Sequence, residues 1–326
     1  MALAVTAAVT DKACIPDLGP LGIWSAQLDV QPMTRAQQAA AELDELGFGA
    51  LWVPEAVARE PFANAALLLR DTARITVATG IASLHARTAM TMNAGWRTLS
   101  EAFPGRFLLG VGVSHQPLVN GAHQGEYGDK PYSTMVDYLN KMDAGVFLGA
   151  ASPVAPRRVL AALGPRMLRL AAERGVGAHS YFVPVEHSAV AREALGGDAL
   201  LAPAQTVVFE SDPTAARQIA RRFMAMYLTL PNYTNNLRRL GWGDDDLDGG
   251  GSDRLVDAIV AWGSLEQIAA RVQEHLDAGA DHVCVQVQTS DTQRLPVAEW
   301  RELASIIPSL RTRSALTPIR VPNREP

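Results

Sequence analysis

The sequence has few cysteines, no excess of basic residues and no long apolar run, and each absence excludes a class of protein. Cys14 and Cys284 are the only cysteines in 326 residues and lie far apart, which argues against a disulfide framework and favours a reducing cytoplasm. The formal net charge of −5 leaves no basic face for nucleic acid. No apolar run reaches the ~18 residues of a membrane span.

Signature motifs of several enzyme classes are also absent. The chain has no Walker A loop, no H-E-x-x-H and no G-x-S-x-G, so phosphoryl transfer, zinc peptidase and α/β-hydrolase activities lack their motifs. The seven histidines are dispersed, so no metal site is expected. Gly110-Val111-Gly112 lacks the third glycine of a dinucleotide fingerprint. Residues 1–19 have no basic residue before their apolar part and are expected to be a loose leader, not a secretory signal.

Short β-rich segments alternate with longer helical ones, which predicts βα units and a parallel sheet. Strands are expected at residues 22–28, 50–53, 75–82, 105–113, 159–163, 179–183, 206–210 and 282–288. Eight strands separated by helices are typical of a closed (β/α)8 barrel, with an open doubly wound sheet as the alternative. We assign residues 20–312 to this single domain and 313–326 to a C-terminal tail.

Capping motifs locate several helix starts. Thr34 with Gln37 and Ser264 with Gln267 predict capping boxes, and Asp212 precedes Pro213 as an N-cap.

Residues 227–262 are more than a minimal barrel needs between two of its strands, so we expect an insertion there. Its acidic, glycine-rich part, 244–251, is expected to be a mobile, solvated loop, followed by a helix over 253–262. The stretch 233–242 could face a substrate or a partner.

Residues 105–113 form an apolar run that ends in glycines and exposes the polar pair Ser114 and His115. An α/β barrel presents its site at such carboxyl ends of strands. The alternative is that Gly110 and Gly112 only relieve crowding and His115 is a loop residue.

A second candidate feature is the turn Gly164-Pro165-Arg166-Met167 between a strand and a helix. Free backbone N–H groups at a helix start, beside an arginine, suit a phosphate. An ordinary helix start with a solvent-exposed arginine is the alternative.

The segments LWVPE, VATGIAS, GRFLLGVGVSH, ALGPRMLRLAAERGVGA and DAIVAWGSLEQIAARVQEHLDAGADHV, in this order and spacing, resemble the bacterial luciferase-like superfamily over roughly residues 20 to 310. The chain is most similar to its coenzyme F420-dependent oxidoreductases, and FMN-dependent relatives share the same skeleton. The resemblance implies a (β/α)8 barrel with the cofactor across its C-terminal mouth. It also implies a homodimer and a small-molecule substrate.

The resemblance further implies particular site residues. In F420-dependent relatives a non-prolyl cis peptide backs the deazaflavin ring, and the matching positions are Gly80 and Ile81. The relatives' phosphate-binding turn matches Gly164 and Pro165, beside which Arg166 and Arg169 could meet the anionic tail of F420. The expected cofactor-binding residues are Gly80, Ile81, Ser83, Ser114, Gly164, Pro165, Arg166 and Met167, with Trp24, Val53 and Ile81 as apolar packing near the ring or, equally, as barrel filling.

The chain departs from its sugar-phosphate-oxidising relatives at two positions. It has Glu55-Ala56 where they carry Asp-His, and His115 where they carry a glutamate. The proton-handling residue is therefore predicted to be either His115 or Glu55, and sugar-phosphate specificity is not transferred. We expect hydride transfer between F420 and a small organic substrate. The alternatives are an FMN-dependent monooxygenase and a flavin-binding barrel without turnover.

Overall fold

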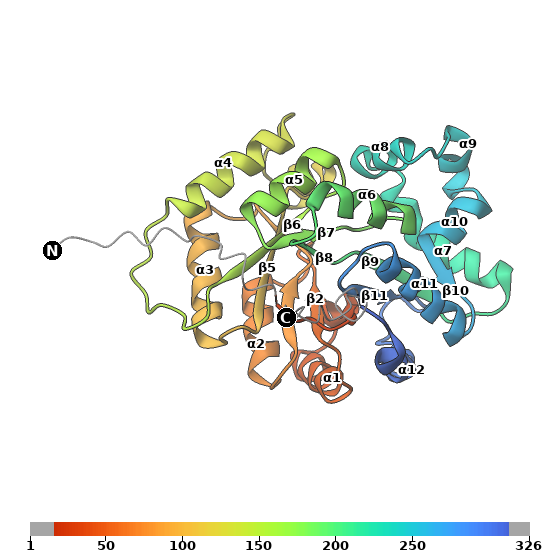
Figure 1. The fold of residues 1–326 in the computed structure, drawn as a ribbon, viewed down its shortest axis with the longest axis horizontal. Helices are drawn as coiled ribbons and strands as arrows, with labels where there is room; N and C mark the ends of the chain where they lie inside the picture. Colours follow the sequence, from red (N-terminus) through yellow and green to blue (C-terminus); the bar gives the residue numbers. More distant parts are fainter. Residues whose placement is uncertain (1–15, 313–326) are drawn as a thin grey trace, which may run out of the picture.

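The computed structural model describes residues 16–312, so the tail 313–326 and most of the expected leader lie outside the described residues. Parallel strands form the centre of the molecule and helices surround them (Figure 1). The strands are β1 (Leu21–Trp24), β2 (Ala50–Val53), β3 (Thr76–Thr79), β4 (Ala82–Ser83), β5 (Phe107–Gly112), β6 (Arg157–Ala161), β7 (Gly177–His179), β8 (Leu200–Leu201), β9 (Ala204–Val208), β10 (Val260–Trp262) and β11 (Val283–Val287).

Most of the helices lie on the outer face of these strands. The helices are α1 (Met33–Glu45), α2 (Pro61–Arg70), α3 (Ala89–Ala102), α4 (Pro131–Asp143), α5 (Pro165–Arg174), α6 (Val185–Leu195), α7 (Pro213–Tyr227), α8 (Pro231–Arg239), α9 (Asp244–Leu247), α10 (Asp253–Ile259), α11 (Leu265–Asp277) and α12 (Val297–Ile306). Of these, α8 to α10 belong to a lobe at one side of the barrel. Apolar side chains of the strands and helices share one large core between the two layers. A smaller cluster that includes Trp24, Trp52 and Cys284 fills the space inside the strands.

The strands close into a barrel through residues 200–208. β8 pairs with β7 on one side, and β9, which continues β8, pairs with β11. β11 pairs with β1, which completes the ring. Because β4 likewise continues β3 along β5, the ring has eight strand positions, and the predicted (β/α)8 barrel is confirmed over the open sheet.

Several predicted strand boundaries are wrong. β1 ends at Trp24, because the chain turns into a 3-10 helix at Gln27–Val30. β6, β7 and β9 start at Arg157, Gly177 and Ala204, each before the predicted position. The start of β6 was predicted too late because of Arg158. This arginine is buried and ion-paired with Asp143, and its charge interrupts the apolar pattern that predicts a strand.

The glycines of β5 make room for the neighbouring strand. A Cβ on Gly110 would lie 1.9 Å from the Thr79 carbonyl oxygen, and one on Gly112 would lie 2.5 Å from Ile81 Cδ1. The predicted strand 75–82 is in fact divided at this point, into β3 and β4. The expected close approach is therefore confirmed, and the group that approaches is the segment between β3 and β4.

Two of the three predicted helix starts are confirmed. Ser264 and Gln267 form the capping box of α11, and Asp212 caps α7 through the Ala215 N–H. The box at Thr34 is wrong, because α1 begins at Met33 after Pro32 and has no side-chain cap.

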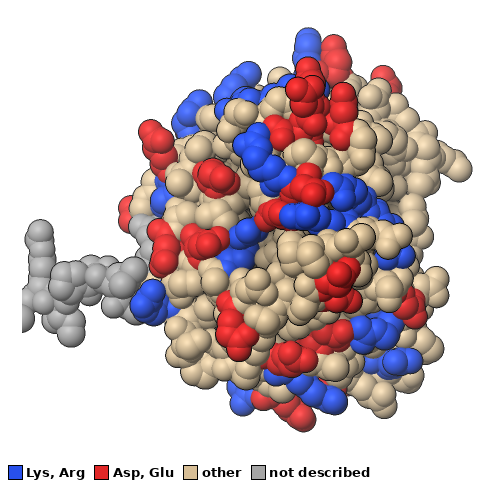
Figure 2. Space-filling view, turned by 90° about the vertical axis from the view of Figure 1, so that its right-hand side faces the viewer, with Lys and Arg blue, Asp and Glu red and all other residues tan. Residues whose placement is uncertain are grey.

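The insertion is ordered: it forms α8 to α10 and β10, which together with α7 make a lobe drawn at one side of the barrel (Figure 1). The tract 244–251, expected to be a mobile loop, instead contains α9 and a 3-10 turn, because Asp244 pairs with Arg238 and Asp246 with Arg254. Figure 2 shows the resulting interleaving of acidic and basic side chains on this side of the molecule.

The helix predicted over 253–262 ends at Ile259, and β10 follows it. β7 pairs with β8 but ends at His179. The last residues of β9, which continues β8, would therefore lack a neighbouring strand on the β7 side. β10 pairs with them from Thr206 to Val208, which satisfies backbone groups that burial would otherwise leave unpaired.

Candidate active site

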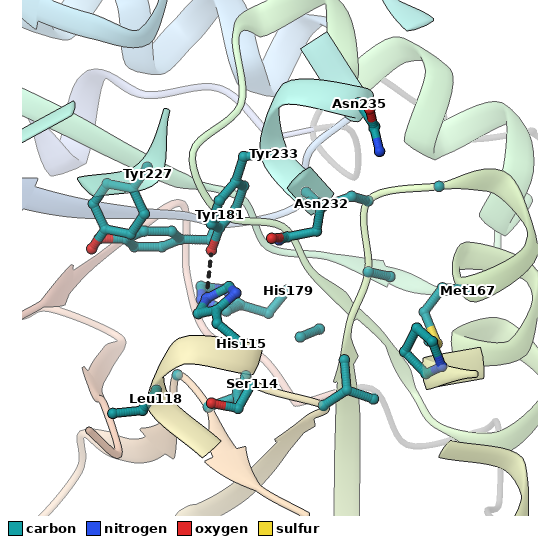
Figure 3. Close-up of a pocket in the computed structure, with 18 of the residues that line it drawn as sticks. Ser114, His115, Leu118, Met167, His179, Tyr181, Tyr227, Asn232, Tyr233 and Asn235 are labelled. Atoms are coloured by element: carbon teal, nitrogen blue, oxygen red, sulfur yellow. Dashed lines mark hydrogen bonds between the residues drawn. The ribbon is translucent and has the colours of Figure 1, made fainter. Parts of the chain in front are cut away.

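The carboxyl ends of the strands and the insertion enclose a cavity of about 580 Å³. Its lining includes the last residue of β1 and residues just after β2, β3, β5, β6 and β7, which come from one end of the barrel, together with residues of α7 and α8. Figure 3 shows the tyrosines on one side of the cavity, Met167 on the other and His115 between them. This is the end of the barrel at which such folds carry out chemistry.

One part of the cavity wall is built around Gly80. The peptide bond between Gly80 and Ile81 is cis, as the resemblance predicted. The Trp24 indole N–H donates to the Gly80 carbonyl oxygen at 2.9 Å. A Cβ on Gly80 would lie 2.7 Å from that indole nitrogen, so the position requires glycine.

His179 adds a buried acceptor beside Gly80. Its Nδ1 lies 2.8 Å from the Ala202 carbonyl oxygen and therefore donates the ring hydrogen. Its ring stacks on Trp52 with 4.5 Å between centroids. Burial lowers the pKa of His179 to about 4, so the ring is neutral near pH 7. Nε2 has no partner, and His179 lines the cavity, which marks this nitrogen as a candidate ligand contact.

His115 projects from the end of β5 into the cavity (Figure 3). Ser114 before it has φ of +60°, the left-handed region, which turns the chain at this point. His115 Nε2 lies 3.4 Å from the Tyr233 hydroxyl. Burial lowers the pKa of His115 below its ordinary value, and the nearby Asn232 side chain partly opposes that shift.

Glu55 also lines the cavity, but its carboxylate is held by other groups of the protein. Both of its oxygens contact Arg87, and one also accepts the Ser83 N–H at 2.7 Å. The ion pair is nearly buried on both sides.

The turn before α5 forms a cationic corner. Gly164 is the N-cap of α5 and Pro165 its first residue, as predicted. A Cβ on Gly164 would lie 3.3 Å from Nη2 of Arg239, which reaches the turn from α8. The Arg166 guanidinium lies over the Tyr132 ring, 4.2 Å from its centroid. Two arginines and a helix amino end therefore meet in one place, which suits an anion.

Three tyrosines line the opposite part of the cavity (Figure 3). The Tyr181 hydroxyl donates to Gln286 Oε1 at 2.7 Å and lies 3.0 Å from the Tyr227 hydroxyl. The rings of Tyr181, Tyr227 and Tyr233 pack against one another, with centroids 5.3 to 6.3 Å apart. Burial raises the pKa of Tyr181 and Tyr233 well above the ordinary value and also raises that of Tyr227. All three hydroxyls are therefore neutral.

Most of the residues predicted for the site lie together. Those that line the cavity are Glu55, Gly80, Ile81, Ser114, His115, Gly164, Pro165, Arg166 and Met167, with Trp24. Ser83 and Val53 are fully buried and do not line it. Arg169 is exposed on α5 and does not line it either.

The sequence reasoning missed Arg239, His179, Tyr181 and Tyr227. Tyr233 belongs to the stretch 233–242, for which the sequence offers a substrate-facing position as one alternative, and it lines the cavity. The run of amides and arginines in LPNYTNNLRRLGW was the available signal for Arg239.

Among residues 16–312, no three His, Cys, Asp or Glu side chains are grouped as metal ligands. Over the same residues, no helix is both long and apolar enough to cross a bilayer.

A closed parallel barrel with an imidazole, a buried acceptor and a helix amino end beside two arginines at its C-terminal mouth has the architecture of (β/α)8-barrel enzymes. The sequence profile of the luciferase-like monooxygenase family matches residues 18–282. The chain belongs to this family of enzymes, and the resemblance to the luciferase-like superfamily is confirmed.

Comparison with individual proteins agrees with this assignment. A relative from Mycobacterium tuberculosis that is named "putative coenzyme F420-dependent oxidoreductase" is 30% identical over 120 residues, a match that spans 37% of this chain and only 33% of that relative. A solved F420-dependent secondary alcohol dehydrogenase, in complex with an F420-acetone adduct, shares the fold with a TM-score of 0.72 at 14% identity, over 90% of this chain and 99% of that one.

A second solved structure binds a different flavin. The oxygenating constituent of 3,6-diketocamphane monooxygenase from Pseudomonas putida, in complex with FMN, has a TM-score of 0.62 at 18% identity, over 90% of this chain and 97% of that one. At these identities the two solved structures establish the shared fold.

Proposed function

We propose that the protein is a coenzyme F420-dependent oxidoreductase that passes a hydride between the deazaflavin and a small organic substrate. The observation that carries the proposal is the cationic corner at one end of the cavity; the other charged side chain among the described lining residues, Glu55, is already paired with Arg87. Arg166, Arg239 and the amino end of α5 suit both the phosphate of F420 and its anionic polyglutamate tail, which FMN lacks. The similarity to the M. tuberculosis F420-dependent oxidoreductase supports the same cofactor.

The uncharged part of the cavity fits a planar ring. Gly80 and Ile81 offer a face without a bulky polar side chain, and Trp24 packs beside it. The unpartnered Nε2 of His179 can accept a hydrogen bond from a ring N–H, which would satisfy a buried acceptor. When bound, the deazaflavin supplies the carbon that gives or takes a hydride.

His115 holds the accompanying proton in this proposal. Its ring is neutral near pH 7, since burial lowers its pKa, and neutral imidazole can accept a proton from a substrate hydroxyl. Glu55 is the less suitable base, because Arg87 and the Ser83 N–H already occupy its oxygens.

Titration of the protein with F420 and with FMN, followed by fluorescence quenching, tests the cofactor. Clearly tighter binding of F420 is expected, and equal or tighter binding of FMN would instead assign the FMN-dependent monooxygenase. Arg239→Gln should weaken F420 binding, whereas Arg169→Gln, on the exposed side of the same corner, should not. Light scattering of the same samples tests the predicted homodimer.

A further inference from the structure

The part of the cavity around His115 offers no counter-ion to a charged substrate. Among the described residues that line the cavity, the charged side chains are Glu55, Arg166 and Arg239. Glu55 is already paired with Arg87, and the two arginines lie at the turn before α5. An anion or a cation placed beside His115 would lose its hydration without gaining a partner, which is costly.

The tyrosines at this end have little hydrogen-bonding capacity left. Tyr181 donates to Gln286, and the Tyr227 hydroxyl lies 3.0 Å from that of Tyr181, to which it can donate. Their rings thus present mainly apolar surface to the cavity. The polar groups that remain beside them are the His115 ring, the Tyr233 hydroxyl and the Asn232 amide, which lie together (Figure 3).

The mouth on this side is apolar as well. Met226, near the end of α7, lines the cavity and is 57% exposed. Leu118, after β5, lines it from the barrel side. Exposed apolar side chains at the rim of a pocket typically contact an apolar ligand.

Resting on the proposed function, we propose that this end of the cavity is a subsite for a neutral, mainly hydrocarbon substrate that carries a single carbonyl or hydroxyl oxygen. The oxygen lies against His115 and Tyr233, and the hydrocarbon lies against Tyr181, Tyr227 and Met226. Phosphate esters, carboxylates and sulfonates are thereby excluded as substrates at this end.

Binding of two ligands of nearly equal shape tests the subsite without any turnover. Cyclohexyl methyl ketone is neutral and cyclohexanecarboxylate is an anion, and ligand-observed NMR measures the affinity of each at neutral pH. The measurement is made on the protein saturated with F420 or, should F420 not bind, in an excess of inorganic phosphate, so that the cationic corner is not open to the carboxylate. The ketone should bind about ten-fold more tightly or better, because the anion finds no partner. A carboxylate that binds as tightly as the ketone would overturn the proposal.

A matched pair of variants places the ligand. Met226→Arg introduces a cation at the mouth. It should reduce the ratio of ketone affinity to carboxylate affinity by about two- to five-fold, the range for a partly exposed ion pair. Met90→Arg adds the same charge at a methionine that is 71% exposed and does not line the cavity, so the preference should not change. An equal effect of both variants would show that overall charge sets the preference, and would overturn the subsite.

The two proposals fail in different ways. Absence of F420 binding would contradict the proposed function, but the protein can still prefer the ketone when phosphate occupies the cationic corner. A protein that binds F420 and prefers the carboxylate keeps the proposed function and loses the subsite.

Discussion

Glu55, after β2, and Arg87, before α3, form an ion pair in which the two side chains are only 9% and 8% exposed. Arg87 Nη1 lies 2.8 Å from Glu55 Oε2, and the Ser83 N–H donates to the same oxygen. The Tyr138 hydroxyl of α4 donates to the Arg87 carbonyl oxygen at 2.9 Å. The pair therefore joins β2, β4, α3 and α4 at the rim of the cavity.

Removing one member of this pair should destabilise the protein strongly. Glu55→Ala leaves the buried Arg87 guanidinium without its main partner, so the free energy of unfolding should fall by ~3–5 kcal/mol in chemical denaturation. Glu60→Ala is the control, because Glu60 contacts the same arginine at 3.2 Å from a side chain that is 50% exposed. Its loss should be about 1 kcal/mol, mostly from its role as the N-cap of α2. Equal losses would contradict the structural role of Glu55.

Gly164→Val tests the cationic corner as the cofactor's phosphate site. The new side chain would enter the space beside the Arg239 guanidinium and block the approach of an anion to the start of α5. Affinity for F420 should fall by about ten-fold or more, the equivalent of one charged hydrogen bond, while thermal unfolding stays cooperative. Gly243→Val is the control, since nothing lies within 4 Å of a Cβ there. Unchanged F420 affinity would show that the phosphate of F420 binds at another part of the barrel.

The barrel could be predicted from the sequence because its signals are local. Short apolar segments, and glycines such as Gly110 and Gly112 within them, can be recognised from neighbouring residues alone. β8 and β10 were missed for the opposite reason. Leu200 and Leu201 are too few to form a pattern, and β10 exists because β9 needs a neighbour beyond His179, which only the three-dimensional arrangement shows.

The candidate site divides in the same way. His115 and Gly164 follow strands directly, so a βα pattern places them at the barrel mouth. Arg239 reaches the Gly164 turn from a helix many residues later, and the tyrosines meet only because the insertion folds back over β7. The acidic tract looked unstructured because its partners, Arg238 and Arg254, lie outside it.

Four buried histidines should make the protein unstable in mild acid. Burial lowers the pKa of His179, His187 and His282 to about 4 and that of His275 to about 3. Between the ordinary value of ~6.5 and pH 4, the unfolded chain binds protons that the folded chain does not. Stability therefore rises with pH in this window and falls as the pH is lowered through it.

Denaturation midpoints measured from pH 7 to pH 4 check this expectation. The four histidines contribute an uptake of up to about four protons on unfolding, which Asp29, whose pKa burial raises to about 6 in the folded chain, offsets by up to about one. Carboxylates such as Asp143, whose pKa is lowered in the folded state by its arginine partners despite burial, lose their contribution only at still lower pH. A midpoint that stays constant between pH 6.5 and pH 4.5 would contradict the prediction.

The last prediction assigns the proton to His115. A general acid or base is typically worth ~10²–10⁴-fold in rate, so His115→Ala should lower turnover by that factor and leave F420 affinity nearly unchanged. A screen of F420 reduction by alcohols and of F420H₂ oxidation by activated alkenes provides the assay. If turnover survives in His115→Ala within a few-fold and is lost in Glu55→Gln, the proton belongs to Glu55.

The pH profile separates His115 from a merely structural residue. In the direction in which the substrate loses a proton, His115 must be neutral, so kcat/KM should fall only below the ordinary imidazole value of ~6.5. Asn232→Ala removes the side chain that partly opposes the lowering of the His115 pKa, so the acid limb of the pH profile should move to still lower pH. Asn235→Ala, a second exposed amide that lines the cavity, should leave the limb in place. An acid limb of the kcat/KM profile that does not shift in Asn232→Ala would show that another group takes the proton.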